Sequence, residues 1–195
     1  MNKYIKFCSG LTESPEIVKA LKENVITKIV RVCNPITIDR FISKNGVIKN
    51  NIFNVLSGTV LFFLENDDAI GFDIDDNKFS IVSWYAIHNG EKYNTEYFIH
   101  DLGLSYISHN DPLYSRSGEW DHVVGHKIKK IRIIDYDDGR HRRDFKDSFQ
   151  KAIVFETDDG DMVISDLPGV RTVLPLIRKS KIPKEIWDNS KIIEI

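Results

Sequence analysis

The chain has 195 residues, of which 42% are hydrophobic and 29% are charged, so it can bury a substantial core, and disorder is not expected over most of its length. A formal net charge of −2 argues neither for nor against a nucleic-acid partner. The first ten residues lack the apolar core of a secretory signal, and no apolar run approaches the roughly 20 residues that span a bilayer. We therefore expect a cytoplasmic protein that makes no membrane contact.

The two cysteines, Cys8 and Cys33, do not have the spacing of metal ligands. In a chain of this length they are typical of buried, small apolar groups rather than of a disulfide framework. Cysteines that are buried and not joined in disulfides are typical of proteins in a reducing compartment.

The N-terminal part predicts a short strand at Tyr4–Cys8 and a one-sided helix that ends near Asn24. Ser14 is the expected N-cap of that helix, because Pro15 follows it at the first helical position. The β-branched run Val25–Cys33 predicts a strand, and the segment Ile36–Asn51 suggests a loop or a short hairpin.

A three-stranded meander is predicted over Gly58–Ile87, with acidic turns at Glu65–Asp68 and Asp75–Asn77. Its connections are only a few residues long, so neighbouring strands are expected to be antiparallel. The polar, aromatic segment Asn89–Gly125 then predicts an irregular connection with short strands at Tyr97–His100 and Ser105–Ser108. A connection this long is typical of a binding or lid element.

The C-terminal part predicts a strand at His126–Asp135 and a second acidic hairpin within Gln150–Ile177. A short helix started by Pro183 and an edge strand at Ile192–Ile195 complete the chain.

The two halves of the chain show a similar pattern. The run Ile26–Val32 is similar to Lys127–Ile133, and each precedes its acidic hairpin. We expect an α+β, predominantly antiparallel fold, with two similar β-meander units in tandem, a short N-terminal helix and a short C-terminal helix. The chain is expected to form one compact domain over 1–195, or two β-subunits, 1–88 and 118–195, joined by 89–117. Chance similarity between strands that end in Asp-rich turns is the alternative to a true repeat.

Acidic residues concentrate at the hairpins. Asp and Asn suit turns for local structural reasons, which is the alternative to any functional role. Two such turns can also form one negative surface that steers a basic partner. The carboxylates predicted to contact a partner are Glu65, Asp67, Asp68, Asp75, Asp76, Asp158, Asp159 and Asp161.

Aromatic residues in the irregular segment are typical either of loop packing or of a protein interface. If they form an interface, Tyr114, Arg116 and Trp120 are the expected anchors.

No catalytic signature is present. The sequences that begin at Asp73 and Asp135 resemble calcium loops only faintly, because they lack the glycine and glutamate that such loops need. The histidines lack paired-ligand spacing, and no glycine-rich phosphate loop appears. We expect no metal, no cofactor and no enzymatic activity. The alternatives are a metal-dependent nuclease or phosphoesterase that uses the hairpin carboxylates, or a module that binds a small ligand or nucleotide.

A basic cluster extends over Lys127–Arg132 and Arg140–Lys146. Carboxylates interleave with it, so a solvated strand face is favoured over a phosphate-binding site. Direct binding to nucleic acid is therefore not expected.

Two runs carry a resemblance to a known family: GEWDHVVGHKIKKIRI at Gly118–Ile133 and AIVFETDDGDMVIS at Ala152–Ser165. Together with strand-rich units and acidic hairpin tips, they resemble bacterial immunity proteins of polymorphic-toxin and contact-dependent inhibition systems. The resemblance covers roughly the C-terminal half. It implies a non-enzymatic antitoxin that binds a cognate protein toxin, often a basic nuclease, and covers its active site. It assigns no functional residues, because the contact surface in that family diverges rapidly.

Overall fold

The computed structural model describes residues 5–7, 10–75, 80–88, 91–92, 99, 104–137, 149–168 and 174–195. The helices of this part are α1 (Pro15–Glu23), α2 (Pro35–Asn45), α3 (Ile52–Val55) and α5 (Lys184–Asp188), with 3-10 turns at Leu11–Glu13, Lys49–Asn51 and Lys179–Lys181. The strands before the irregular segment are β1 (Ile5–Phe7), β2 (Ile26–Cys33), β3 (Val60–Leu64), β4 (Ala69–Asp75), β5 (Ser80–His88) and β6 (Glu91–Lys92). The later strands are β7 (Ser105–Ser108), β8 (Lys130–Asp135), β9 (Gln150–Glu156), β10 (Asp161–Ser165), β11 (Leu176–Ile177) and β12 (Lys191–Glu194).

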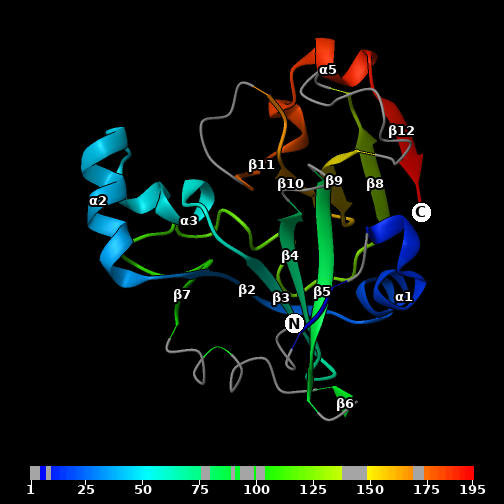
Figure 1. The fold of residues 1–195 in the computed structure, drawn as a ribbon, viewed down its shortest axis with the longest axis horizontal. Coiled ribbons are helices and arrows are strands. Elements are labelled where there is room, and N and C mark those ends of the chain that lie inside the picture. The colour runs from blue at the N-terminus through cyan, green and yellow to red at the C-terminus, as the bar shows by residue number, and fades with distance from the viewer. Residues whose placement is uncertain are drawn as a thin grey trace.

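The described strands form two antiparallel sheets. The first has seven strands in the order β1-β5-β4-β3-β2-β7, with β6 paired to β5, and the second has five in the order β11-β10-β9-β8-β12. The meanders β2-β3-β4 and β8-β9-β10 follow the same strand order, and short helices lie near both ends of the chain. The expected α+β fold with two β-meander units is therefore confirmed. Figure 1 shows α2 and α3 at one side of the molecule and α1 at the other.

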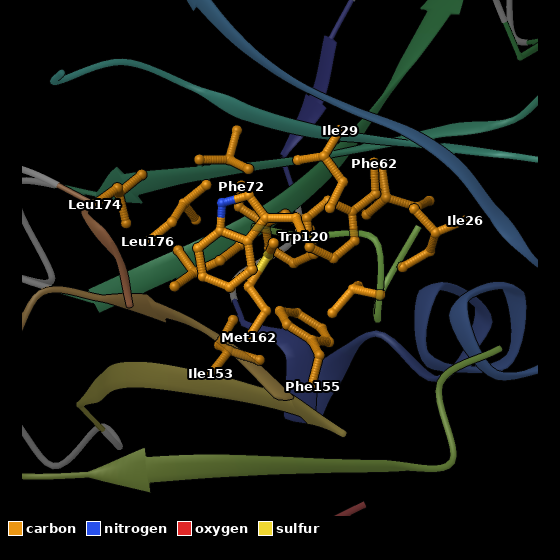
Figure 2. Packing of buried hydrophobic residues seen from close by; sticks show 14 of the residues in the cluster. Ile26, Ile29, Phe62, Phe72, Trp120, Ile153, Phe155, Met162, Leu174 and Leu176 are labelled. Atoms are coloured by element: carbon orange, nitrogen blue, oxygen red, sulfur yellow. The ribbon is translucent and has the colours of Figure 1, made fainter. Parts of the chain in front are cut away.

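The two sheets share one hydrophobic core. Phe62 and Phe72 from the first sheet meet Phe155 from the second edge to face, with ring centroids 5.0 to 5.5 Å apart. Figure 2 shows these rings together with the indole of Trp120. Aromatic pairs of this geometry add about 0.5–1.5 kcal/mol each beyond the burial of their surface.

The outer faces of both sheets are also covered. Ile182, which precedes α5, and Ile186, in the middle of that helix, pack on the second sheet together with Val154 and Val163. On the first sheet, Trp84 lies over Gly71, and a methyl group at position 71 would overlap the indole ring. A glycine is needed there because the ring occupies the place of a side chain.

The predicted strand at His126–Asp135 begins later than expected. Residues 126–129 instead run beside the start of β2, where Val25 forms an isolated bridge with Lys127, and β8 begins at Lys130. The other strands predicted in the described part are present, including Ser105–Ser108 and the edge strand β12. A strand was also expected at Tyr97–His100, but of these four residues the structure describes only Ile99.

The prediction of a loop or hairpin at Ile36–Asn51 is wrong. The dipeptide Asn34-Pro35 ends β2, but it also begins α2, because Pro35 occupies the first turn and the Asn34 side chain accepts a hydrogen bond from the N–H of Ile36 at 3.1 Å. Gly46, with φ of 62°, ends the helix in the left-handed conformation.

Helix α1 begins at Pro15 as expected, with Ser14 in the N-cap position. The Ser14 side chain does not cap the helix, however. Its hydroxyl is buried and donates to the carbonyl oxygen of Gly10 at 2.8 Å.

Cys33 is a buried free thiol, as predicted, and Cys8 lies outside the described residues. No helix in the described part of the chain is both long enough and apolar enough to cross a membrane.

Candidate functional site

The first acidic turn connects β3 to β4 and has a defined backbone. The N–H of Leu64 donates to the carbonyl of Asp68 at 2.8 Å, and the N–H of Asp67 donates back to Leu64 at 3.1 Å. Asn66 accepts the N–H of Asp68 through its side-chain oxygen at 3.2 Å. Asp67 has a φ of 64°, a region that Asp tolerates better than most residues. The Asp and Asn residues therefore have a structural role in shaping this hairpin.

The same turn also presents carboxylates to solvent. Glu65 and Asp67 are exposed, whereas Asp68 is half-buried. Glu65 Oε1 accepts the N–H of Val25 at 3.1 Å, which fixes its side chain against the start of β2. Within the described part of the chain, no lysine, arginine or histidine forms an ion pair with Glu65 or Asp67.

The second acidic turn connects β9 to β10 and is organised by a threonine. The Thr157 hydroxyl oxygen accepts the N–H groups of Asp159 and Gly160, each at 3.2 Å, and donates to the carbonyl of His122 at 2.6 Å. This turn is therefore anchored to the segment that precedes β8.

In contrast to the first turn, both aspartates of the second turn contact a basic side chain. Asp158 lies 3.2 Å from the ammonium group of Lys129, and Asp159 lies 3.2 Å from Nδ1 of His126. Both contacts are largely exposed, so their stabilising effect is small, but the ammonium group of Lys129 reduces the negative field that the turn presents to a partner.

Asp161 and Glu156, at the base of the second hairpin, bind basic neighbours within the molecule. Asp161 Oδ1 accepts the N–H of Lys179 at 2.5 Å, and Glu156 Oε1 accepts from the ammonium group of the same residue at 2.8 Å. Arg132 also contacts Glu156. Burial opposes ionisation of Glu156, but the hydrogen bonds and charges of Lys179 and Arg132 hold its pKa below the ordinary value.

The two acidic turns lie on either side of residues 125–129. Glu65 exchanges hydrogen bonds with Val25, which bridges to Lys127, and the adjacent His126 pairs with Asp159. The turns are thus neighbours, but the basic residues between them divide the surface. It is not uniformly negative.

Asp75 lies elsewhere. It is the last residue of β4, and the seven-residue strand separates it from the first turn by about 20 Å. Asp76, also predicted to contact a partner, lies outside the described residues.

Trp120 is a core residue. Its side chain is 1% exposed, and its indole N–H donates to the Asn54 side chain at 2.9 Å. Figure 2 shows the indole surrounded by apolar side chains from both sheets. Its predicted role as an interface anchor is therefore wrong for this fold, because a partner has no access to the ring.

Tyr114 and Arg116, the other two predicted anchors, lie closer to the surface. Tyr114 is half-buried, with the ammonium group of Lys49 5.4 Å from its ring centroid. Arg116 is exposed and lies 3.8 Å from Glu119.

A polar cluster surrounds Arg178, and no pattern in the sequence predicted it. Its guanidinium group contacts His122, stacks over the Trp120 ring at 5.1 Å and donates to the carbonyl of Glu119 at 2.8 Å. His122 is also 2.8 Å from the carbonyl oxygen of Asp161. Burial and the adjacent arginine lower the pKa of His122 despite that hydrogen bond, so the imidazole is neutral at neutral pH. The cluster joins the segment before β8 to β10 and β11, and we assign it a structural role.

The basic strand face predicted to be solvated is paired with carboxylates. Lys130 lies 3.3 Å from Glu194, and Arg132 lies 3.1 Å from the same residue. The continuation at Arg140–Lys146 lies outside the described residues.

Among the described residues, no three His, Cys, Asp or Glu side chains are grouped so as to hold a metal ion. Comparison of the chain with protein-family models, characterised proteins and solved structures gave no match.

Proposed function

We propose that this protein is a non-enzymatic inhibitor that binds a cognate protein toxin, in the manner of a bacterial immunity protein, and that the Glu65–Asp68 turn enters a basic cleft of that toxin. The observation that carries the proposal is the contrast between the two turns. The first exposes Glu65 and Asp67, with which no described basic residue pairs, whereas Asp158 and Asp159 each contact a basic side chain.

The backbone of the first turn supports this role. Its hydrogen bonds and the contact between Glu65 and Val25 hold the carboxylates in place before a partner arrives. A preorganised turn loses less conformational entropy on binding than a flexible loop does. The exposed carboxylates would occupy the positions of nucleic-acid phosphates in a basic nuclease and exclude the substrate.

The test uses the reading frame that neighbours this gene, because toxin and inhibitor genes of such systems are expected to be adjacent. Expression of the neighbouring product alone should arrest bacterial growth, and coexpression of this chain should restore it. The triple variant E65Q/D67N/D68N should lose the rescue. The double variant D158N/D159N is the matched control, since it removes carboxylates that are already paired, and it should retain the rescue.

Two outcomes would contradict the proposal: a neighbouring product that is neither toxic nor bound by this chain, or equal rescue by both variants. The nuclease alternative has its own test, in which the purified chain is incubated with plasmid DNA and magnesium. Hydrolysis that EDTA abolishes would favour that alternative.

A further inference from the structure

Strand β7 is the terminal strand of the first sheet. It pairs with β2 on one side, and on its other side no described strand pairs with it. Ser105 and Tyr106 are exposed, and Tyr106 is one of the large hydrophobic residues at the surface, with 40% of its area exposed. A strand at the edge of a sheet presents backbone N–H and C=O groups with which another strand can pair.

The hydrogen bonds at the end of β7 show which backbone groups face outward. The N–H of His109 donates to the carbonyl of Ile29 at 2.9 Å, so His109 faces β2. The direction in which residues face alternates along an antiparallel strand. Leu104, Tyr106 and Ser108 therefore face away from β2, towards the open side of the sheet.

The neighbouring strand gives the same assignment. Tyr106 lies opposite Val32, whose N–H donates to Thr59 at 2.9 Å, on the β3 side of β2. Two opposite residues that exchange no hydrogen bonds both point away from each other. The N–H and carbonyl of Tyr106 are thus directed outward, and no described residue forms a hydrogen bond with either.

Two further groups along this edge are already bonded within the chain. The N–H of Leu104 donates to the carbonyl of Ile99 at 3.1 Å. The carbonyl of Ser108 accepts the N–H of Asp111 at 3.0 Å and the hydroxyl of Ser115 at 2.6 Å. The groups left without a partner among the described residues are the carbonyl of Leu104, the N–H and carbonyl of Tyr106, and the N–H of Ser108.

These four groups are complementary to the same groups of a second copy of the chain. If two β7 strands pair antiparallel about a twofold axis at Tyr106, the N–H of each Tyr106 lies against the carbonyl of the other. The N–H of each Ser108 then lies against the carbonyl of Leu104 in the second copy. The remaining bond of that pair, from the N–H of Leu104 to the carbonyl of Ser108, is absent, but these are the two groups that each chain already bonds internally.

This pattern favours a second copy over an unrelated strand. An unrelated strand would bring a carbonyl opposite the N–H of Leu104, which is already bonded to Ile99 and cannot donate to it. That carbonyl would lose its water without gaining a partner, which is unfavourable. In the second copy, the carbonyl at this place belongs to Ser108 and is satisfied before the strands meet.

The side chains of β7 also allow self-pairing. Residues 104–108 contain no charge, proline or glycine, whereas edge strands that stay unpaired commonly carry charges or proline. A twofold axis at Tyr106 places the two tyrosine rings opposite each other as a cross-strand aromatic pair. Lys28 holds each ring in position, since its ammonium group donates to the Tyr106 hydroxyl at 2.9 Å and lies 4.3 Å from the ring centroid.

We propose that this protein forms a twofold homodimer in which two β7 strands pair antiparallel at Tyr106 and join two seven-stranded sheets into one. This dimer goes beyond the inhibition of a toxin and does not depend on it. The paired segment is short, so the interface lies below the roughly 1,200 Å² that a standard complex buries, and a dissociation constant of about 10–100 µM is expected.

The test is sedimentation velocity over concentrations from about 5 µM to about 500 µM, across which the chain should pass from monomer to dimer. Y106K places two ammonium groups opposite each other and should weaken the dimer by about tenfold or more. I36K is the matched control, because it adds the same charge at an exposed apolar residue of α2, and it should dimerise like the wild type. Y106F keeps the ring without the Lys28 hydrogen bond and should also dimerise.

Hydrogen exchange of the wild type locates the contact without any substitution. The amides of Tyr106 and Ser108 should exchange severalfold more slowly at the high concentration, whereas the amide of Ile107, which faces β2, should not change. A chain that is monomeric at the high concentration, a dimer that Y106K leaves intact, or a dimer without this protection of Tyr106 would overturn the proposal. Since the assay contains only this chain, its failure is distinguishable from failure of the growth rescue.

Discussion

Arg31 is a buried cation whose removal should destabilise the whole fold. Its side chain is 0% exposed and donates three hydrogen bonds, to the carbonyls of Phe53 at 2.7 Å, Gly58 at 3.0 Å and Leu174 at 2.9 Å. Burial lowers its pKa to about 9, so the guanidinium group remains protonated at neutral pH. The three bonds connect β2 to α3 and to the segment that leads into β11.

Substitution of Arg31 by methionine tests this role, because methionine has a similar length and removes every donor. Each carbonyl left buried without a partner costs about 1–3 kcal/mol. Relief from burying a charge offsets part of that sum, so we expect a net loss of about 3–5 kcal/mol. For a chain of this size, that loss corresponds to a fall in Tm of roughly 6–20 °C.

Urea denaturation followed by tryptophan fluorescence measures the free energy of unfolding. Arg40→Met is the control, since Arg40 is exposed on α2, and its effect should stay within about 0.5 kcal/mol. An R31M variant as stable as the R40M control would refute the assignment of Arg31 as a connection between the two sheets.

Two further predictions concern the packing and charge of the sheets. Because the pKa of Glu156 is held below its ordinary value, its ion pairs with Lys179 and Arg132 contribute stability at neutral pH, and this stability is lost as the pH falls through the folded-state pKa. The wild type should therefore lose more free energy of unfolding than E156Q between neutral and strongly acidic pH. Equal losses in parallel urea titrations would contradict this prediction. Gly71→Ala should destabilise the protein by about 1–3 kcal/mol, because the added methyl group overlaps the Trp84 ring. If calorimetry shows that the variant has the same Tm as the wild type, the prediction is wrong and the indole can move aside.

Elements defined by local chemistry could be predicted from the sequence. Helix α1 follows from Pro15 and the apolar spacing after it, and the β3–β4 hairpin follows from two apolar runs around a short acidic turn. Helix α2 stands where a loop or hairpin is expected, because the dipeptide Asn34-Pro35 both ends a strand and is a good helix start. Its C-terminal Gly46 was available in the sequence as a second signal.

Whether each candidate residue is exposed, paired or buried depends on tertiary contacts, which no local sequence pattern encodes. Asp158 and Asp159 look like the acids of the first turn, but Lys129 and His126 reach them because residues 126–129 run past the hairpin. Trp120 sits in a polar segment and yet fills the core. The strand at Ser105–Ser108 was expected, but its place at the edge of the first sheet was not, because it pairs with β2, which is distant in the sequence.

The most direct test of the proposed function is the rate at which this chain associates with the product of the neighbouring reading frame, measured by stopped-flow fluorescence over a range of ionic strength. If the Glu65–Asp68 turn steers a basic partner, E65Q/D67N/D68N should slow association by about 10-fold or more at low salt and flatten the salt dependence. D158N/D159N should associate at the rate of the wild type. Identical rates and identical salt dependence for the wild type and the triple variant would contradict the account.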